Sequence, residues 1–299
     1  MLRTSNELIA DLKVRGAIPT SQDRFTNARF LAIANAELQT KVFPLVLRAR
    51  QSYYEYDIDT AINASGLYPI STRAYLGIVS NVGLVDSTNR LDLPWLSEET
   101  ETDTNQPSRA SAGVILKRNT LQLKPLDGLG YTYFRTSILL RPGEYVLEAA
   151  AAQITGISGS VLTFAASTIP STWSATNIFD LIQGNPQYDT LGIDLAASAV
   201  GATTITLSAS PSSRLAVGDW ISLAGQSSIV QLPEAFAYLL SQRVANTAMR
   251  SMGDAKGFEH GEAIAKEMEK ALTDAIQPRI QKEAQRIVSR NGLLRRNGR

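Results

Sequence analysis

One skeleton of residues occurs twice in the middle of this chain, in a stretch that is poor in charge. The first copy, residues 161–184, reads VLTFAASTIPSTWSATNIFDLIQG, and the second, residues 205–225, reads ITLSASPSSRLAVGDWISLAG. Each copy has a β-type run, a turn rich in Pro and Ser, a Trp or Leu, a short spacer and a second β-type run that ends in Gly. No helical period survives across residues 150–228, so this stretch predicts strands joined by turns.

Two copies of such a strand pair limit the possible folds. A single two-stranded hairpin is marginally stable in water, whereas two pairs can share one core. We therefore predict that residues 150–228 form an inserted β module, built from two related strand pairs, that closes as a small antiparallel barrel or sandwich. Trp173 and Trp220 fall at non-equivalent places in the two copies, and we expect both side chains in the core.

The N-terminal segment predicts helices. Thr4 or Ser5 can cap a short amphipathic helix that Gly16 ends. An apolar stripe with helical spacing then runs from residue 30 to residue 42. Pro44 lacks a backbone donor and clashes with the preceding turn, so we expect it to kink or restart this helix.

The segment after the β module also predicts helices. Pro233 suits the first position of a helix whose apolar stripe continues until Gly253 ends it. Asp254 can cap a second helix that continues to Pro278. Helices therefore open and close the chain, and the simplest arrangement packs the two ends together around the inserted β structure.

Short strands are predicted between the first helices and the β module. Polar and apolar residues alternate from Tyr53 onward, and further strands are expected at 76–85, 113–124 and 131–140, which would form one small sheet. Residues 97–109 are acidic and polar, as in a surface loop. The predicted fold class is α+β, with a helical bundle formed by the N- and C-terminal segments, a small β-sheet and the inserted β module.

This pattern divides the chain into three predicted parts. Residues 1–149 and 229–278 form a helical domain with the small sheet, residues 150–228 form the β module, and residues 279–299 form a basic C-terminal tail. The tail carries seven Lys or Arg residues and one Glu. It is either a frayed end or a docking peptide, in which two leucines fill a groove of a partner and the arginines meet its acids.

Composition excludes several classes of function. The chain has 299 residues and a net charge of +1, which argues against a protein whose whole surface binds nucleic acid. It has no cysteine, so disulfides, thiolate metal sites and cysteine nucleophiles are excluded. No run approaches the roughly 18 apolar residues of a membrane span, so we expect a soluble protein without membrane contact.

No residues form a recognisable catalytic or cofactor motif. His260, the single histidine, lies outside any zinc motif and is expected to be an exposed helix residue. Asp57 and Asp59 resemble a glycosidase pair only in being two carboxylates, and ordinary strand polarity is the stronger interpretation. Tyr53, Tyr54 and Tyr56 alternate with acids rather than bases, which favours packing over base stacking. We predict no enzyme activity, no cofactor and no metal.

Several segments resemble one family over nearly the whole chain. They are IPTSQDRFTNARFLAIANAELQTKVFPLVLRARQSYYEYDI, LRPGEYV, SRLAVGDWISLAGQ, QLPEAFAYLLSQRVANTAMRSMGD and the ending VSRNGLLRR. In their order along the chain and in their local sequence they resemble the head-to-tail adaptor (connector) proteins of tailed bacteriophages. The β region at 150–228 departs from the smaller adaptors of phages with short tails.

The resemblance implies a structural protein of the virion, assembled in the cytoplasm of the host bacterium. Such adaptors form a ring, typically of twelve copies, beneath the portal protein. The ring extends the channel through which genomic DNA passes without sequence-specific binding, and it carries the tail or nozzle protein. The resemblance places portal docking in the C-terminal tail, where the candidate residues are Arg290, Asn291, Leu293, Leu294, Arg295 and Arg296.

Two other classes of function stay open on the sequence. One is another virion component, a tail or decoration protein whose β module binds a neighbouring subunit or a host glycan. The other, with the weakest support, is an enzyme such as a tail-associated glycan hydrolase. A position restricted to the portal vertex would distinguish an adaptor from another virion component. Catalytic activity that depends on a defined carboxylate pair would indicate an enzyme.

Overall fold

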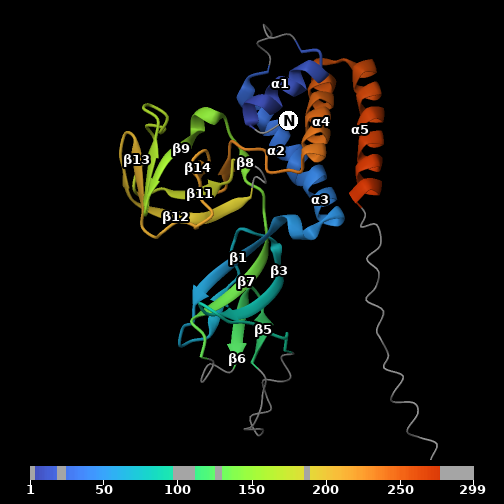
Figure 1. The fold of residues 1–299 in the computed structure, drawn as a ribbon. Coiled ribbons are helices and arrows are strands. Elements are labelled where there is room, and N and C mark those ends of the chain that lie inside the picture. The colour runs from blue at the N-terminus through green and yellow to red at the C-terminus, as the bar shows by residue number, and fades with distance from the viewer. Residues whose placement is uncertain (1–3, 19–24, 97–111, 125–129, 185–188, 277–299) are drawn as a thin grey trace, which may run out of the picture.

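The computed structural model describes residues 4–18, 25–96, 112–124, 130–184 and 189–276. Figure 1 shows three modules: helices at the N- and C-terminal parts of the described chain, a barrel beside them, and a stem of strands that projects away from both. We call residues 55–140 the stem and residues 151–223 the barrel. Each module has its own cluster of buried apolar side chains.

The helices and strands follow one another in this order. The first helices and the stem are α1 (Ser5–Arg15), α2 (Asn27–Glu37), the π turn η1 (Leu38–Val42), α3 (Phe43–Ala49), the 3-10 turn η2 (Gln51–Tyr54), β1 (Glu55–Ala61), β2 (Leu67–Pro69), β3 (Ala74–Val85), β4 (Arg90–Asp92), β5 (Gly113–Lys117), β6 (Thr120–Lys124) and β7 (Tyr133–Leu140). The remaining elements are β8 (Glu144–Tyr145), η4 (Glu148–Ala150), β9 (Ala151–Ser158), β10 (Val161–Phe164), β11 (Ile178–Ile182), β12 (Thr190–Val200), β13 (Thr204–Leu207), β14 (Trp220–Leu223), β15 (Gln226–Ser227), α4 (Glu234–Met252) and α5 (Ala255–Ile276).

Capping residues set the ends of α1. The Thr4 hydroxyl accepts the Glu7 N–H at 3.3 Å, and the Glu7 carboxylate accepts the Thr4 N–H at 3.2 Å, which completes a capping box. Gly16 follows the last helical residue. Of the two predicted caps, Thr4 is the one used, and Gly16 ends the helix as predicted.

The second helical segment does not break at Pro44. The Phe43 N–H donates to the Leu38 carbonyl, so η1 is a π turn, and α3 continues through Pro44 to Ala49. A π turn changes the hydrogen-bond register just before the residue that lacks a donor. The α-helical hydrogen bonds restart at Phe43, so Pro44 lies in the first turn of α3, as the predicted restart requires.

The run 27–49 is long and apolar enough to cross a membrane by length and composition, which corrects the prediction that no run approaches a membrane span. Its apolar side chains lie in the core of the helical module: Phe30, Leu31, Ala34, Leu38, Val42, Phe43 and Val46 are buried there. Burial in a protein core accounts for its composition.

Helices from the two ends of the described chain pack together. Leu8 and Leu12 of α1 and Phe30 of α2 share one core with Phe236 and Leu240 of α4. Gly253, with φ +88°, ends α4 as predicted. Pro233 precedes α4 as its N-cap rather than occupying its first position, and the Asp254 carboxylate caps α5 by accepting the Gly257 N–H at 2.9 Å.

The stem holds two sheets, where one was predicted. The four-stranded sheet has the order β1-β7-β3-β4, and the three-stranded sheet has the order β2-β6-β5. Between them lies a core in which Tyr68 and Phe134 stack at 4.3 Å between ring centroids. The first strand begins at Glu55, because Tyr53 and Tyr54 belong to the 3-10 turn that leaves the helical module.

The inserted β module is a closed antiparallel barrel of order β10-β13-β12-β11-β14-β9. This confirms an antiparallel β module and selects the barrel over the sandwich. The prediction that each copy is a strand pair was wrong in one respect. The two strands of a copy do not pair with each other: β10 pairs with its counterpart β13, and β11 pairs with its counterpart β14.

The loops of the two copies adopt the same hydrogen-bonded turn. The Asn177 side chain accepts the N–H of Ser174, and the Asp219 carboxylate accepts the N–H of Ala216, in both cases three residues back. Trp173 precedes Ser174 as Leu215 precedes Ala216, so these two apolar residues are equivalent. With β9 and β12 added, each half of the barrel is a three-stranded unit, and the pairing of β9 with β10 and β14 mirrors that of β12 with β13 and β11.

Only one of the two tryptophans lies in the barrel core. Trp173 is buried against Phe179, with 5.1 Å between ring centroids. Trp220 is half-buried, because it is one residue from the inward-facing Ile221 and successive strand residues face opposite sides.

Replacing the buried tryptophan should destabilise the barrel. We expect Trp173→Ala to lower its free energy of unfolding by about 3–5 kcal/mol, because a large side chain is lost from a packed core. Urea unfolding, monitored by hydrogen exchange of the β10 and β13 amides, measures this change in the free energy of unfolding. Trp95→Ala, at a side chain 46% exposed, is the matched control and should change stability by less than about 1 kcal/mol.

Two tyrosines buried in the helical core should make it sensitive to alkali. Burial raises the pKa of Tyr54 and of Tyr145 above the ordinary value of 10.0. The Tyr54 hydroxyl donates to the Gln231 carbonyl at 2.8 Å, whereas that of Tyr145 has no hydrogen-bond partner among the described residues. The folded protein keeps both hydroxyls protonated. Their contribution to the free energy of unfolding is therefore fully present below pH 10, and it is lost as the pH rises above 10.

We therefore expect Tyr145→Phe to leave stability unchanged or slightly higher at pH 7, because a buried unpaired hydroxyl is removed. Above pH 10 its free energy of unfolding should fall less steeply than that of the parent protein, by up to about 1.4 kcal/mol per pH unit. Thermal melts across pH 7–11 test this, with Tyr133→Phe, at an exposed side chain, as the control. A parallel pH dependence for Tyr145→Phe and the parent would contradict it.

Candidate functional site

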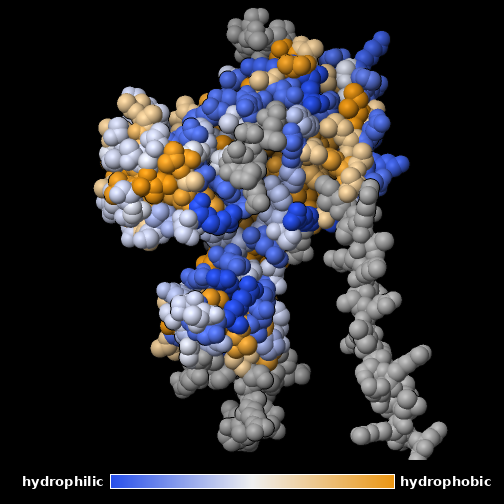
Figure 2. Space-filling model, viewed as in Figure 1, coloured by the Kyte–Doolittle hydropathy of each residue, from blue (hydrophilic) through white to orange (hydrophobic). Residues whose placement is uncertain are grey.

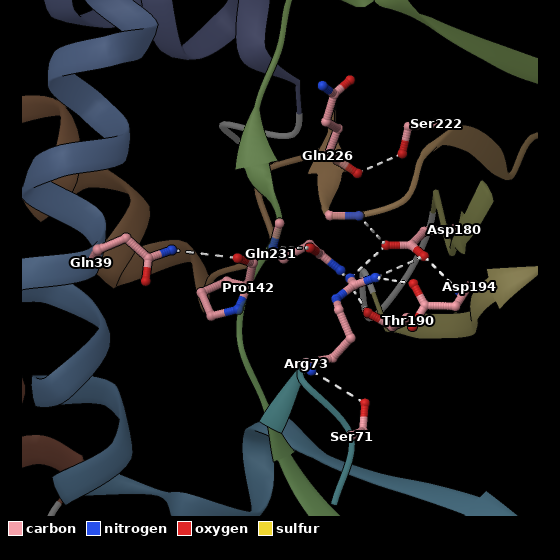
Figure 3. Close-up of polar contacts among 12 residues, drawn as sticks. Gln39, Ser71, Arg73, Pro142, Asp180, Thr190, Asp194, Ser222, Gln226 and Gln231 are labelled. Atoms are coloured by element: carbon pink, nitrogen blue, oxygen red, sulfur yellow. Dashed lines mark hydrogen bonds and ion pairs between the residues drawn. The ribbon is translucent and has the colours of Figure 1, made fainter. Parts of the chain in front are cut away.

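The three modules meet at a cluster of polar side chains around Arg73 (Figure 3). Arg73 lies in the turn before β3, where its backbone N–H donates to the Ser71 hydroxyl at 3.2 Å and its carbonyl accepts the Arg141 N–H at 3.0 Å. Its guanidinium reaches the barrel and binds Asp180 through both terminal nitrogens, at 2.6 and 3.2 Å. The same guanidinium contacts Asp194 at 2.7 Å.

The barrel prepares this carboxylate pair with its own backbone. Asp180 is only 4% exposed, and its oxygens also accept the N–H groups of Asp194, at 3.0 Å, and of Gly225, at 2.8 Å. Asp194 lies in an irregularity of β12 and has φ +52°, a conformation uncommon for residues other than glycine. That conformation directs both its N–H and its carboxylate into the site.

Electrostatics at the junction favours the charged guanidinium. Burial opposes the charge of Arg73, but the hydrogen bonds and charges of Asp180 and Asp194 outweigh it, so its pKa is raised. The neighbouring Tyr56 has a raised pKa, chiefly because of burial and then because of the charge of Asp180, while a backbone hydrogen bond from Ile193 acts in the opposite direction. Tyr56 belongs to the stem and Ile193 to the barrel, so this contact also crosses the junction.

Gln231 joins the same junction to the helical module. Its side chain accepts the Gly143 N–H at 3.4 Å and donates to the Thr190 hydroxyl at 2.9 Å, and its carbonyl accepts the Tyr54 hydroxyl. Nearby, the Gln39 side chain donates to the Pro142 carbonyl at 3.4 Å (Figure 3). Buried polar side chains therefore hold the linker after the barrel against both other modules.

A polar cleft of about 670 Å³ opens between the three modules. Hydrophilic residues also gather where the stem meets the upper modules in Figure 2. On the barrel wall Arg214 pairs with Asp189 at 2.7 Å, and on the stem wall Arg135 faces the cleft. The cleft is lined by Ser52, Tyr53, Tyr54, Glu55, Tyr56, Asp57, Arg135, Leu140, Asp189, Thr190, Leu191, Ser212, Arg214 and Gln231.

The two carboxylates considered as a glycosidase pair are engaged by one arginine. Arg135 on β7 contacts Asp59 at 2.7 Å and Asp57 at 3.2 Å, and Asp57 also accepts the Ser137 hydroxyl. The hydrogen bond to Asp59 and then the charges of Asp59 and Asp57 raise the pKa of Arg135, against the effect of burial. Both acids thus belong to a cross-strand ion-pair cluster on β1 and β7, as ordinary strand polarity predicts.

The three tyrosines near residue 55 serve different contacts. Tyr54 is buried and packs edge-on against Phe43, with 4.8 Å between centroids, and Tyr53 packs on Tyr54. Tyr56 lies at the stem–barrel contact. The prediction of packing rather than base stacking is confirmed for Tyr54.

The other residues singled out by sequence fall away from the junction. His260 is exposed on α5, as predicted. The proposed portal-docking residues Arg290, Asn291, Leu293, Leu294, Arg295 and Arg296 lie outside the described residues. Sequence reasoning missed Arg73, Asp180 and Asp194. An available signal was the acid in IFDLI: a charge in an otherwise apolar strand needs a partner when buried.

The junction is suited to holding modules together. Its guanidinium, carboxylates and amides are already bonded to one another across module boundaries. Among the described residues, no group of His, Asp and Glu side chains could hold a metal ion. No protein-family model matches the chain, and a search of curated proteins found no relative.

The central ion pair should contribute strongly to stability. We expect Asp180→Asn to lower the free energy of unfolding by about 3 kcal/mol, because Arg73 would keep a buried charge that is only partly compensated. Asp189→Asn removes one partner of the exposed pair with Arg214 and should change stability by less than about 1 kcal/mol. Chemical denaturation of both variants measures the difference, and equal losses would contradict this role of Asp180.

Proposed function

We propose that this protein is a structural head-to-tail adaptor of a tailed bacteriophage, and that it acts by assembly rather than catalysis. In this role copies form a ring beneath the portal, extend the DNA channel and provide the attachment platform for the tail. The observation that carries the proposal is the junction: two β modules project from a helical module, and buried polar contacts join all three modules at one place. This architecture suits a part that presents separate surfaces to several neighbours.

The helical module is the proposed ring-forming unit. It is built from segments at both ends of the described chain, with α1 and α2 packed on α4 and with α5 along the other side of α4 (Figure 1). Contacts repeated head to tail close a ring when the rotation between copies closes. Twelve copies, the number typical of the family that the sequence resembles, is the proposed stoichiometry.

Balanced charge supports passage of DNA through such a ring. A channel wall that neutralised many phosphates would hold the genome through release of counterions. The chain has 29 basic and 28 acidic residues. The guanidinium groups of Arg73, Arg135 and Arg214 are paired with aspartates of the same chain. We therefore propose contact with DNA that is weak and independent of sequence.

The C-terminal tail is the proposed portal contact. We expect a chain shortened by residues 290–299 to fold like the parent protein but to fail to join portal rings, because the leucines and arginines of the docking segment are removed. Co-sedimentation with the phage's portal rings measures joining, and circular dichroism measures folding. A double variant, Leu293→Ser with Leu294→Ser, tests the apolar anchors separately. Normal co-assembly of the shortened chain would overturn the docking role.

The location of the protein in the particle tests the adaptor function itself. Negative-stain images of virions labelled with an antibody should show the protein at the portal vertex only. Label along the tail or over the capsid would instead support the alternative, a tail or decoration protein whose barrel binds a neighbouring subunit or a host glycan.

A further inference from the structure

The barrel and the short turn that follows its last strand form a receptor for a guanidinium. Asp180, on β11, is held by the backbone N–H groups of Asp194, on β12, and of Gly225, two residues after β14. The second carboxylate, that of Asp194, is set by a left-handed backbone conformation at φ +52°. The occupant of this receptor, Arg73, comes from the stem (Figure 3).

The receptor is present at only one of two equivalent places in the barrel: it lies where β11 of one copy pairs with β12 of the other. In the pairing of β11 with β14, Asp180 lies opposite its counterpart Ser222, whose hydroxyl donates to the nearby Gln226 carbonyl. The β12 strand has irregular register beside Asp180, whereas β9 pairs with β14 in unbroken register from Gln153 to Ala151. The equivalent place, where β9 pairs with β14, is instead where the chain enters and leaves the barrel.

These positions give the barrel two kinds of attachment. Its two linkers pair with each other as β8 and β15, and the outgoing linker also bonds to the start of α1, where the Ser5 N–H donates to the Ser228 carbonyl at 2.8 Å. Against the stem, the barrel offers the Arg73 receptor and the side chain of Ile193, which packs on the stem core. The core clusters of the barrel and the stem are otherwise separate.

We propose that Arg73 is a releasable latch between stem and barrel. While Arg73 is bound, the barrel has one orientation relative to the stem. When Arg73 leaves, the barrel turns about its two linkers while both cores stay folded, because neither core includes the latch. Preorganisation of the receptor by backbone amides lets the latch close again without rebuilding the site.

Distance measurement between spin labels tests the latch on the full chain. The chain has no cysteine, so Ala202→Cys in the barrel and Ser87→Cys in the stem, both at exposed positions, give one specific label pair. The parent should show one narrow distance distribution. Arg73→Met, which removes the guanidinium, and Asp180→Asn, which alters the receptor without touching the stem, should both broaden it.

Arg135→Met is the matched control, because it removes an arginine that pairs with two acids inside the stem. Its distribution should stay narrow. Hydrogen exchange on the same proteins should show the Ile193 amide exchanging roughly a hundredfold faster in both latch variants. The amides of the barrel and stem cores should still exchange only through unfolding, no faster than the lowered free energy of unfolding of each variant predicts. A narrow distribution in either latch variant, or broadening accompanied by core exchange faster than that, would overturn the latch.

Discussion

The arrangement of this protein depends on one buried interaction, the guanidinium of Arg73 on the carboxylate of Asp180. A charge removed from water is tolerated only when its partner and its hydrogen bonds are in place. Here the two partners are 107 positions apart in sequence, and each is held in place by its own module. The stem fixes the backbone of Arg73, and the barrel fixes both oxygens of Asp180 with amide donors.

Gln231 has the corresponding role toward the helices. It is almost fully buried, and it bonds at once to the segment leaving the stem, to the barrel and to the tyrosine that precedes the stem. Hydrogen bonds of this kind specify an orientation because an unsatisfied buried amide is costly. The apolar clusters give each module its stability, and the polar contacts determine how the modules are placed relative to one another.

Local rules made part of the fold predictable from sequence. Thr4 and Glu7 form the capping box, Gly253 takes the left-handed conformation that ends α4, and Asp254 caps α5, because each effect depends on residues within one helical turn. The repeated skeleton located the barrel for a similar reason. Its pairing was not predictable, because strands choose partners by distant contacts, and nothing local distinguishes a hairpin within a copy from pairing between copies.

The candidate site was the least predictable part, for the same physical reason. Arg73 stands in an ordinary polar turn, and its importance appears only when the fold brings β11 and β12 beside it. Asp194 gives no local sign of its strained backbone, which the irregular register of β12 imposes.

The repeat lets a charge-poor barrel carry such a specific contact. The two equivalent halves close into one barrel around a single core. Apolar residues of both copies fill that core, such as Phe179, which pairs with Leu223, and Leu181, which pairs with Ile221. Polar positions outside that core can then differ between the copies without loss of the fold. Position 222, beside the linkers, is a serine, whereas position 180 is an aspartate whose carboxylate binds Arg73 of the stem. The difference between the two copies, rather than their similarity, sets the direction in which the barrel faces.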